Sequence, residues 1–294
     1  MILFRVVTPP RVFARMPPVR VESSPPLFRG RNAAPQFVWW QVASDYLRQL
    51  LTLGFVFLTN VVLSPPALVL SWFPGLRIPP DSAQRMITWL IRCWLGFARV
   101  IRTIQVELPD GKNLRDLRGV VVVSNHPSLI DAFLLLAVLP RTVCVMRADL
   151  ASNLIFGGLS RLAGFVPNDR GQALVRGGLE KIRDGENLLI FPEGTRTRCS
   201  SLNPFTKSFA VIARKAGAPI QTILIEREGL YLSKHLPLLA RAALPVRFRV
   251  SLGEIIHPRA GESAAGLSQR VESYFLERLE NDGENIRLVQ RPRP

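Results

Sequence analysis

Cysteine and histidine are scarce in this chain of 294 residues, which contains three of each. The cysteines, Cys93, Cys144 and Cys199, show no paired spacing, so they indicate neither a disulfide framework nor a zinc site and are typical of a reducing compartment. The histidines lie far apart and lack the spacing of metal ligands. The sequence therefore predicts no metal centre.

Motifs of several other enzyme classes are also missing. The chain has no Gly-x-Ser-x-Gly elbow, no Walker phosphate-binding loop, no dinucleotide-binding fingerprint and no His-Glu-x-x-His. Lysine is scarce, but arginine is abundant and the formal net charge is +16, which favours anionic partners such as membrane phosphates, nucleic acids or phosphorylated substrates. Because interleaved aromatic residues and known nucleic-acid modules are absent, we expect no nucleic-acid partner.

Charge is absent from residues 49–76. Pro65 and Pro66 divide this apolar run and are expected to break a helix there. As a helix, the first limb, 49–64, is about 24 Å long, shorter than a hydrocarbon core of ~30 Å. We therefore expect a helical hairpin that enters one leaflet, with a full span or a buried hairpin of a soluble protein as alternatives.

A basic amphipathic helix is predicted from Asp81 to about Thr103. Arg85, Arg92 and Arg99 recur every seven residues and so lie on one stripe, while apolar side chains fill most of the remaining surface. This pattern is typical of a helix at a membrane surface, and an ordinary docked helix with a solvated arginine stripe is the alternative.

The rest of the chain alternates between strands and helices, which indicates an α/β fold: a mixed sheet flanked by helices, preceded by the membrane-associating hairpin. Strands are expected at 119–124, 142–147, 187–191, 220–225 and 246–250. The predicted segments are a disordered arm rich in arginine and proline (1–36), membrane-associating helices (37–105), the α/β domain (106–281) and a tail (282–294).

A polar segment, 124–131 (Ser-Asn-His-Pro-Ser-Leu-Ile-Asp), follows the first of these strands. The carboxyl end of such a strand is the ligand-binding edge of an open α/β sheet. His126 and Asp131 are too far apart in rotation to meet on one regular helix. They meet only if His126 precedes the helix and folds back, so that Asp131 holds one ring nitrogen and leaves the other as a base. The alternative is a capping histidine and an aspartate that favours the helix dipole.

A second polar segment, 192–196 (Pro-Glu-Gly-Thr-Arg), follows the strand at 187–191, so both segments are expected at one edge of the sheet. Gly194 permits a ligand to approach the backbone, Thr195 supplies a hydroxyl, and Arg196 supplies a planar guanidinium that suits a phosphate. A base beside a phosphate site suggests activation of an alcohol on a phosphorylated substrate.

These segments resemble the glycerolipid acyltransferase family typified by the 1-acylglycerol-3-phosphate acyltransferases. The likeness covers about residues 119–226 and rests on Asn125-His126 with Asp131 (the His-x4-Asp motif), on 191–196 (Phe-Pro-Glu-Gly-Thr-Arg) and on 164–170 (Gly-Phe-Val-Pro-Asn-Asp-Arg). Two departures concern the acceptor side in the family: Thr222 stands where proline is common, and 205–208 replaces Phe-Lys-x-Gly.

The resemblance implies phospholipid biosynthesis: an acyl chain moves from a thioester, acyl-CoA or acyl-carrier protein, to the free hydroxyl of lysophosphatidic acid or a similar lysophospholipid. His126 would be the base and Asp131 would hold its tautomer. Implied substrate-binding residues are Arg170, Glu193, Gly194, Thr195 and Arg196. No metal or redox cofactor is expected, because the thioester is already activated. The enzyme would lie on the cytoplasmic face of the inner (plasma) membrane.

Other interpretations remain open at this point. The same family chemistry could serve a different acceptor, or Ser124 could be a nucleophile. From another class, a non-catalytic basic protein that binds membranes or nucleic acid, or a lipid-binding structural protein, would tolerate loss of His126 and Glu193. Arg196 could instead form a structural ion pair with Glu193 or Asp169.

Overall fold

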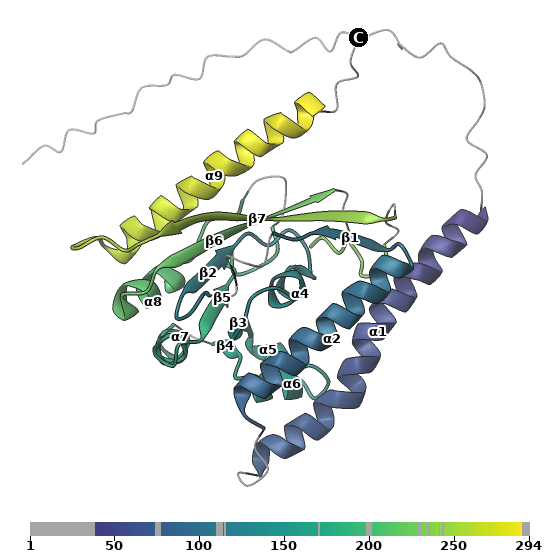
Figure 1. Cartoon of the computed structure of the whole chain (residues 1–294), viewed down its shortest axis with the longest axis horizontal. Coiled ribbons are helices and arrows are strands. Elements are labelled where there is room, and N and C mark those ends of the chain that lie inside the picture. Colours follow the sequence, from purple (N-terminus) through teal and green to yellow (C-terminus); the bar gives the residue numbers. More distant parts are fainter. Residues whose placement is uncertain are drawn as a thin grey trace, which may run out of the picture. The chain divides into compact units, whose positions relative to one another are not determined.

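A computed structural model describes residues 39–73, 78–109, 114, 116–169, 171–197, 202–228, 231–234, 236–240, 242 and 244–289. The arm predicted for residues 1–36 and the predicted site residue Arg170 lie outside the described residues. The described chain begins with two long helices, α1 (Trp39–Trp72) and α2 (Pro80–Val100), and continues into an α/β domain (Figure 1).

The domain is built on a sheet whose seven described strands have the order β1-β7-β6-β2-β5-β3-β4. The strands are β1 (Ile104–Glu107), β2 (Val121–Ser124), β3 (Thr142–Arg147), β4 (Val166–Asn168), β5 (Asn187–Ile190), β6 (Ile220–Glu228) and β7 (Val246–Ile256). Neighbouring strands are parallel except for β6 and β7, which are antiparallel. The predicted mixed sheet is confirmed.

Helices cover both faces of this sheet (Figure 1). They are α4 (Asp131–Leu136), α5 (Ala148–Ala151), α6 (Gly157–Leu162), α7 (Gln172–Arg183), α8 (Ser208–Ala216) and α9 (Ala264–Val289). Val122 of β2 joins a core with α2 and α4, whereas Val121 and Val123 join a second core with α7, α8 and α9. Because successive side chains of a strand point to opposite faces, a short run of valines supplies both cores.

The central strands place both polar segments at one edge of the sheet. β2 and β5 are apolar runs that are buried along their whole length, as expected for strands covered on both faces. They are direct neighbours and parallel, and the other side of β2 pairs in parallel with β6. The segments that follow β2 and β5 therefore leave the sheet side by side.

The hairpin predicted around Pro65 and Pro66 is wrong, because α1 is one helix of 34 residues that passes through both prolines. The hairpin is formed instead by α1 and α2, which run antiparallel (Figure 1). Beside the prolines, the Ser64 hydroxyl accepts the backbone N–H groups of Gly158 (2.9 Å) and Leu159 (3.2 Å) of α6. This tertiary contact supports the helix where the prolines remove two backbone donors.

The α1 helix buries polar side chains and exposes apolar ones. Its buried residues are the polar Gln49, Thr52 and Ser64 together with Ala67. Its large exposed side chains are apolar or aromatic: Trp39, Trp40, Tyr46, Leu47, Leu50, Leu51, Phe57, Leu58, Val61, Val62 and Val69. A helix on a water-soluble protein shows the opposite pattern, and small or polar residues at the contact are typical of helices in lipid. By length and composition, α1 is able to cross a membrane.

Candidate active site

His126 lies in the turn between β2 and α4, and Asp131 is the first residue of α4. The Nδ1 atom of His126 is 2.9 Å from Oδ2 of Asp131. The same carboxylate oxygen accepts the backbone N–H of Ser128 at 2.7 Å. The turn thus folds back over the start of α4, and the contact that the sequence required is formed.

The Asp131 carboxyl is completely buried. Burial raises its pKa, whereas the hydrogen bonds from His126 and Ser128 and the positive charge of Arg227 lower it. When Asp131 is ionised, it accepts the proton on Nδ1 of His126, which leaves the lone pair on Nε2. The buried carboxylate therefore fixes both the orientation and the tautomer of the imidazole.

The rest of the His126 ring is held by packing. Its face stacks on the ring of Phe191, with centroids 4.2 Å apart and an interplanar angle of 22°. The described part of the chain gives Nε2 no hydrogen-bond partner, and the side chain remains partly exposed. Nε2 is thus the ring atom that is available to an incoming hydroxyl.

Glu193 joins the two polar segments. Its Oε1 accepts the backbone N–H of His126 (2.9 Å) and the hydroxyl of Thr197 (2.8 Å), and its Oε2 accepts the backbone N–H (3.0 Å) and Nδ2 (2.7 Å) of Asn203. The backbone N–H of Thr197 also donates to the His126 carbonyl at 2.8 Å. The buried carboxylate uses both oxygens within the protein, so we treat Glu193 as a positioning residue.

Asn125 extends the sheet beyond β2 with its side chain. Its Nδ2 donates to the carbonyl of Ile225 at 2.9 Å, and its Oδ1 accepts the N–H of Ile225 at 2.8 Å. The neighbouring Ser124 is fully buried, and its hydroxyl donates to the Asn125 carbonyl. These contacts fix the start of the His126 turn and argue against Ser124 as a nucleophile.

The Arg196 guanidinium is held from one side. Its NH1 donates to the carbonyls of Leu232 (2.8 Å) and Ser233 (3.1 Å). Within the described residues, its Nε and NH2 have no partner, and Glu193 is bound by other donors. The Nε–NH2 edge, which suits a bidentate contact with a phosphate, therefore remains available.

Residues 231–233 bind the His126 turn, between β2 and α4, as well as Arg196. The Tyr231 carbonyl accepts the hydroxyl of Ser128 at 3.1 Å, and the Leu232 carbonyl accepts the N–H of Leu129 at 3.3 Å. This 231–233 segment, which no motif in the sequence marks, links both polar segments from a third part of the chain.

Arg227 is a further residue that the sequence analysis missed. It lies near the carboxyl end of β6, and its NH1 donates to the Tyr231 carbonyl and to the hydroxyl of Ser233. Burial lowers its pKa, and the charge of Asp131 raises it. The available signal was its place after an apolar strand, 220–225, of the same kind as the strands before the two polar segments.

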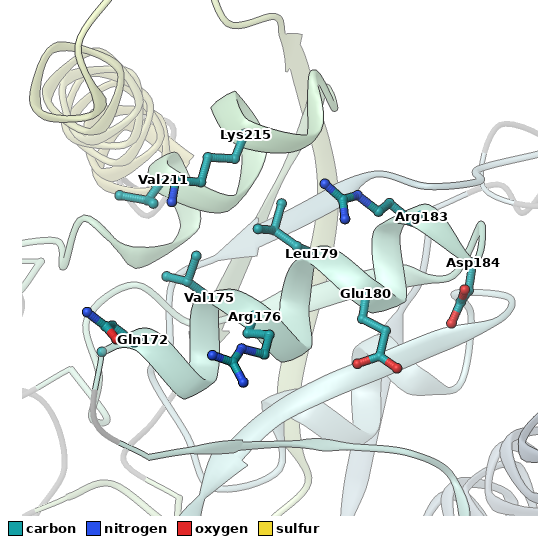
Figure 2. A pocket seen from close by; sticks show the side chains of 10 residues that line it. Gln172, Val175, Arg176, Leu179, Glu180, Arg183, Asp184, Val211 and Lys215 are labelled. Carbon is teal, nitrogen blue, oxygen red and sulfur yellow. The ribbon is translucent and has the colours of Figure 1, made fainter.

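A surface hollow of about 780 Å³ lies between α7 and α8 (Figure 2). Arg176, Arg183 and Lys215 line it together with Glu180 and Asp184. The opposite charges give it no clear preference for a phosphate, and it contains no residue of the two polar segments. Among the described residues, no group of three or more His, Cys, Asp or Glu is placed to hold a metal ion.

Comparisons with known proteins find similarity to acyltransferases. The profile of a family described as acyltransferase matches residues 105–226. A 1-acyl-sn-glycerol-3-phosphate acyltransferase from Pseudomonas aeruginosa is 27% identical over 240 residues, which cover 76% of this chain and 89% of that protein. A lyso-ornithine lipid O-acyltransferase from the same organism is 33% identical over 163 residues, covering 53% of this chain and 59% of that protein. The chain spans about half the length of other curated relatives that it matches.

One solved structure has the same fold. The crystal structure of the 1-acyl-sn-glycerophosphate (LPA) acyltransferase PlsC from Thermotoga maritima aligns with a TM-score of 0.61 and 22% sequence identity. The alignment covers 85% of this chain and 100% of that chain. It includes far more of the chain than the family profile.

Proposed function

The chain belongs to the acyltransferase family, and we propose that it moves an acyl chain from a thioester to the free hydroxyl of lysophosphatidic acid or a similar lysophospholipid. The observation that carries this proposal is the 2.9 Å contact between His126 and the buried Asp131. The contact leaves Nε2 free as a base at the sheet edge where Arg196 also lies. A base and a cation at one edge suit a hydroxyl on a phosphorylated acceptor.

In the proposed reaction, Nε2 of His126 takes the proton of the acceptor hydroxyl as its oxygen attacks the thioester carbonyl. The tetrahedral intermediate expels the thiolate, which receives that proton from His126. Asp131 holds the Nδ1 proton throughout and stabilises the imidazolium that forms. General base catalysis of this kind contributes about 10²- to 10⁴-fold to the rate.

The acceptor phosphate is assigned to the second polar segment. The Nε–NH2 edge of Arg196 would form the bidentate contact, and Thr195 would add a hydroxyl. Gly194 has a positive φ of 65° and is exposed, so its backbone is open to a ligand. Arg170, outside the described residues, stays a predicted phosphate ligand.

The donor is a thioester of coenzyme A or of acyl-carrier protein. Both are already activated toward attack, so the reaction calls for no metal or redox cofactor. The exposed apolar side chains of α1, with the exposed Arg85, Arg92 and Arg99 of α2, support attachment to an anionic membrane surface. The cytoplasmic face of the inner membrane and the lack of a nucleic-acid partner remain our predictions.

A second candidate is the same transfer to a lyso-lipid of another headgroup class. It is favoured by the relative named as a lyso-ornithine lipid O-acyltransferase, which is 33% identical over its matched region. Thr222, which departs from the family pattern, does not bear on this choice. It is buried in β6, and its hydroxyl donates to the Glu254 carbonyl at 2.8 Å.

Mass spectrometry of products tests the proposal and separates the two acceptors. The purified full chain is given lysophosphatidic acid, other lysophospholipids or lyso-ornithine lipid, each with acyl-CoA and with acyl-carrier protein. We expect phosphatidic acid, formed from lysophosphatidic acid, as the main product, and no product from His126→Ala. Preferential acylation of lyso-ornithine lipid would establish the second candidate, and no transfer to any lyso-lipid would refute both.

A further inference from the structure

An apolar turn on the surface has no explanation in the proposed chemistry. Residues 236–240 (Leu-Pro-Leu-Leu-Ala) form a turn closed by a hydrogen bond from the Ala240 N–H to the Pro237 carbonyl at 2.9 Å. Leu238 and Leu239 at its tip are 55% and 50% exposed. Turns that face water are normally built from polar residues and glycine. An exposed apolar tip of this kind marks a surface that binds another apolar phase.

This 236–240 loop is fixed to α1. The Gln49 side chain is buried between them, and its Nε2 donates to the carbonyls of Leu238 (3.3 Å) and Ala240 (3.0 Å). Both amide hydrogens of Gln49 are thus used to hold the loop. Tyr46 and Leu50, which flank Gln49 on the helix, are exposed apolar residues of α1. The loop tip therefore continues the apolar surface of that helix.

Basic residues, Lys234 and Arg241, flank the loop in the sequence but do not lie within it. The loop itself contains no ionisable residue. On α1, the nearest charged side chains, Asp45 and Arg48, form an ion pair with each other. A paired charge is far less costly to place near lipid than a single one.

The loop is also continuous with the active site. Leu236 donates its N–H to the Ser233 carbonyl at 3.3 Å, so the loop follows directly from the 231–233 segment. That segment binds Ser128, Leu129 and Arg196, as described above. Leu129, in the His126 turn, is itself an exposed apolar residue. A short stretch of chain thus connects the catalytic turn with the apolar surface at α1.

We propose that the 236–240 loop inserts into the same lipid leaflet as α1 and forms the membrane side of the path by which a lyso-lipid reaches His126. The occupant of this surface is the acyl-chain region of a bilayer, since the exposed leucines of the loop continue the apolar surface of α1. The inference rests on the proposed function for its substrate, but insertion of the loop is measured without turnover.

The first test uses single fluorescent labels. In a chain with Cys93→Ser and Cys199→Ser, an environment-sensitive label is placed on Leu239→Cys, on Leu58→Cys of α1, or on Ile255→Cys of β7. Leu58 and Ile255 are 62% and 52% exposed, close to the 50% of Leu239. The remaining Cys144 is not labelled, because burial raises the pKa of its thiol to about 12.

With vesicles of phosphatidylglycerol and phosphatidylethanolamine, the labels at 239 and 58 should shift to the blue and be quenched by brominated acyl chains. The label at 255 should not change. If the label at 58 responds but the label at 239 stays in water, the proposal is overturned. It is also overturned if the label at 58 shows neither the blue shift nor the quenching. Shielding of the 239 label without vesicles, in a dimeric sample, would mean that a second copy covers the loop and would also overturn it.

The second test measures turnover. Leu238→Glu combined with Leu239→Glu should lower activity on a long-chain lyso-acceptor in vesicles by about tenfold, because charge is unfavourable in the leaflet. Activity on a short-chain acceptor dissolved as monomers should not change, and the matched Ile255→Glu should change neither. If the double variant loses activity equally on both acceptors, the proposal that the loop lines the entry path of the lyso-lipid is overturned. If the wild type acylates no acceptor, the proposed function fails, while the labels still decide whether the loop inserts.

Discussion

Glu193 accepts the backbone N–H of His126 through Oε1 at 2.9 Å, so one polar segment fixes the other at the edge of the sheet. The contact joins the carboxyl ends of β2 and β5, which are adjacent strands. It explains how Glu193, whose two carboxylate oxygens are both used within the protein, positions His126 without contacting its imidazole. Positioning and catalysis are thereby divided between Glu193 and the His126–Asp131 pair.

Glu193→Gln should reduce both stability and turnover. The glutamine amide would place N–H groups toward the donors of either Asn203 or His126, so at least one buried contact is lost. We expect the free energy of unfolding to fall by about 1–3 kcal/mol and kcat to fall with it. Urea unfolding and steady-state kinetics measure the two effects. Glu228→Gln, at an exposed pair with Arg247, is the control and should change little.

His126→Ala should remove transfer, and Asp131→Asn should lower it by about 10²-fold or more, because the asparagine amide no longer fixes the tautomer with Nε2 unprotonated. Vesicle binding should be preserved in both variants, since α1 is untouched. His257→Ala, an exposed histidine on the chain after β7, is the matched control. Wild-type turnover by purified His126→Ala would rule out the base assignment.

Arg227→Gln should move the acidic limb of the pH profile of kcat/KM to higher pH. The Arg227 charge lowers the pKa of Asp131, so its removal raises that pKa. Asp131 must be ionised to hold the Nδ1 proton, and activity is lost as the pH falls through its pKa; a raised pKa therefore brings the loss at higher pH. Arg227→Lys, which keeps the charge, should move the limb less.

If Arg227 only supports the structure, the Arg227→Gln variant should give a different pH profile. Activity would then fall by the same factor at every pH, with no displacement of the acidic limb. Arg249→Gln removes an exposed arginine that pairs with Glu107, and it should leave the profile unchanged.

Arg196→Lys should raise the acceptor KM and lower kcat while the donor KM changes little. A lysine ammonium cannot keep the contacts with Leu232 and Ser233 and also offer a planar edge to a phosphate. A misplaced hydroxyl reaches Nε2 of His126 poorly, which lowers kcat. Kinetics with each substrate varied in turn decide the matter. If the donor KM rises as much as the acceptor KM, Arg196 does not belong to the acceptor site.

High salt alone should not extract the full chain from membranes. The Arg85, Arg92 and Arg99 contacts with anionic lipid contribute ~1 kcal/mol each and are screened by salt, but the apolar surface of α1 is not. Replacing the three arginines with glutamine should weaken binding to anionic vesicles and leave the salt-resistant attachment through α1 in place. Sedimentation with and without salt measures both. Release by salt alone would contradict insertion of α1.

The sequence by itself determined the α/β domain and its two polar segments. The apolar runs before Ser124 and Phe191 are short and have the composition of covered strands, and each is followed by polar residues, so the strand ends could be read locally. The His126–Asp131 contact was also within reach, because only a turn that precedes the helix satisfies their spacing. Local pattern and chain geometry suffice where the interacting residues are close in sequence.

Only the tertiary structure decided the rest, since the partners come from distant parts of the chain. Asn125 meets Ile225, and Arg196 meets the 231–233 segment, through loops whose paths no local pattern encodes. The continuity of α1 through Pro65 and Pro66 likewise depends on α6, where Gly158 lets the backbones approach so closely that a Cβ atom would lie 1.8 Å from the Ser64 carbonyl. Backbone propensity predicted a break there, and packing between helices far apart in the sequence outweighed it.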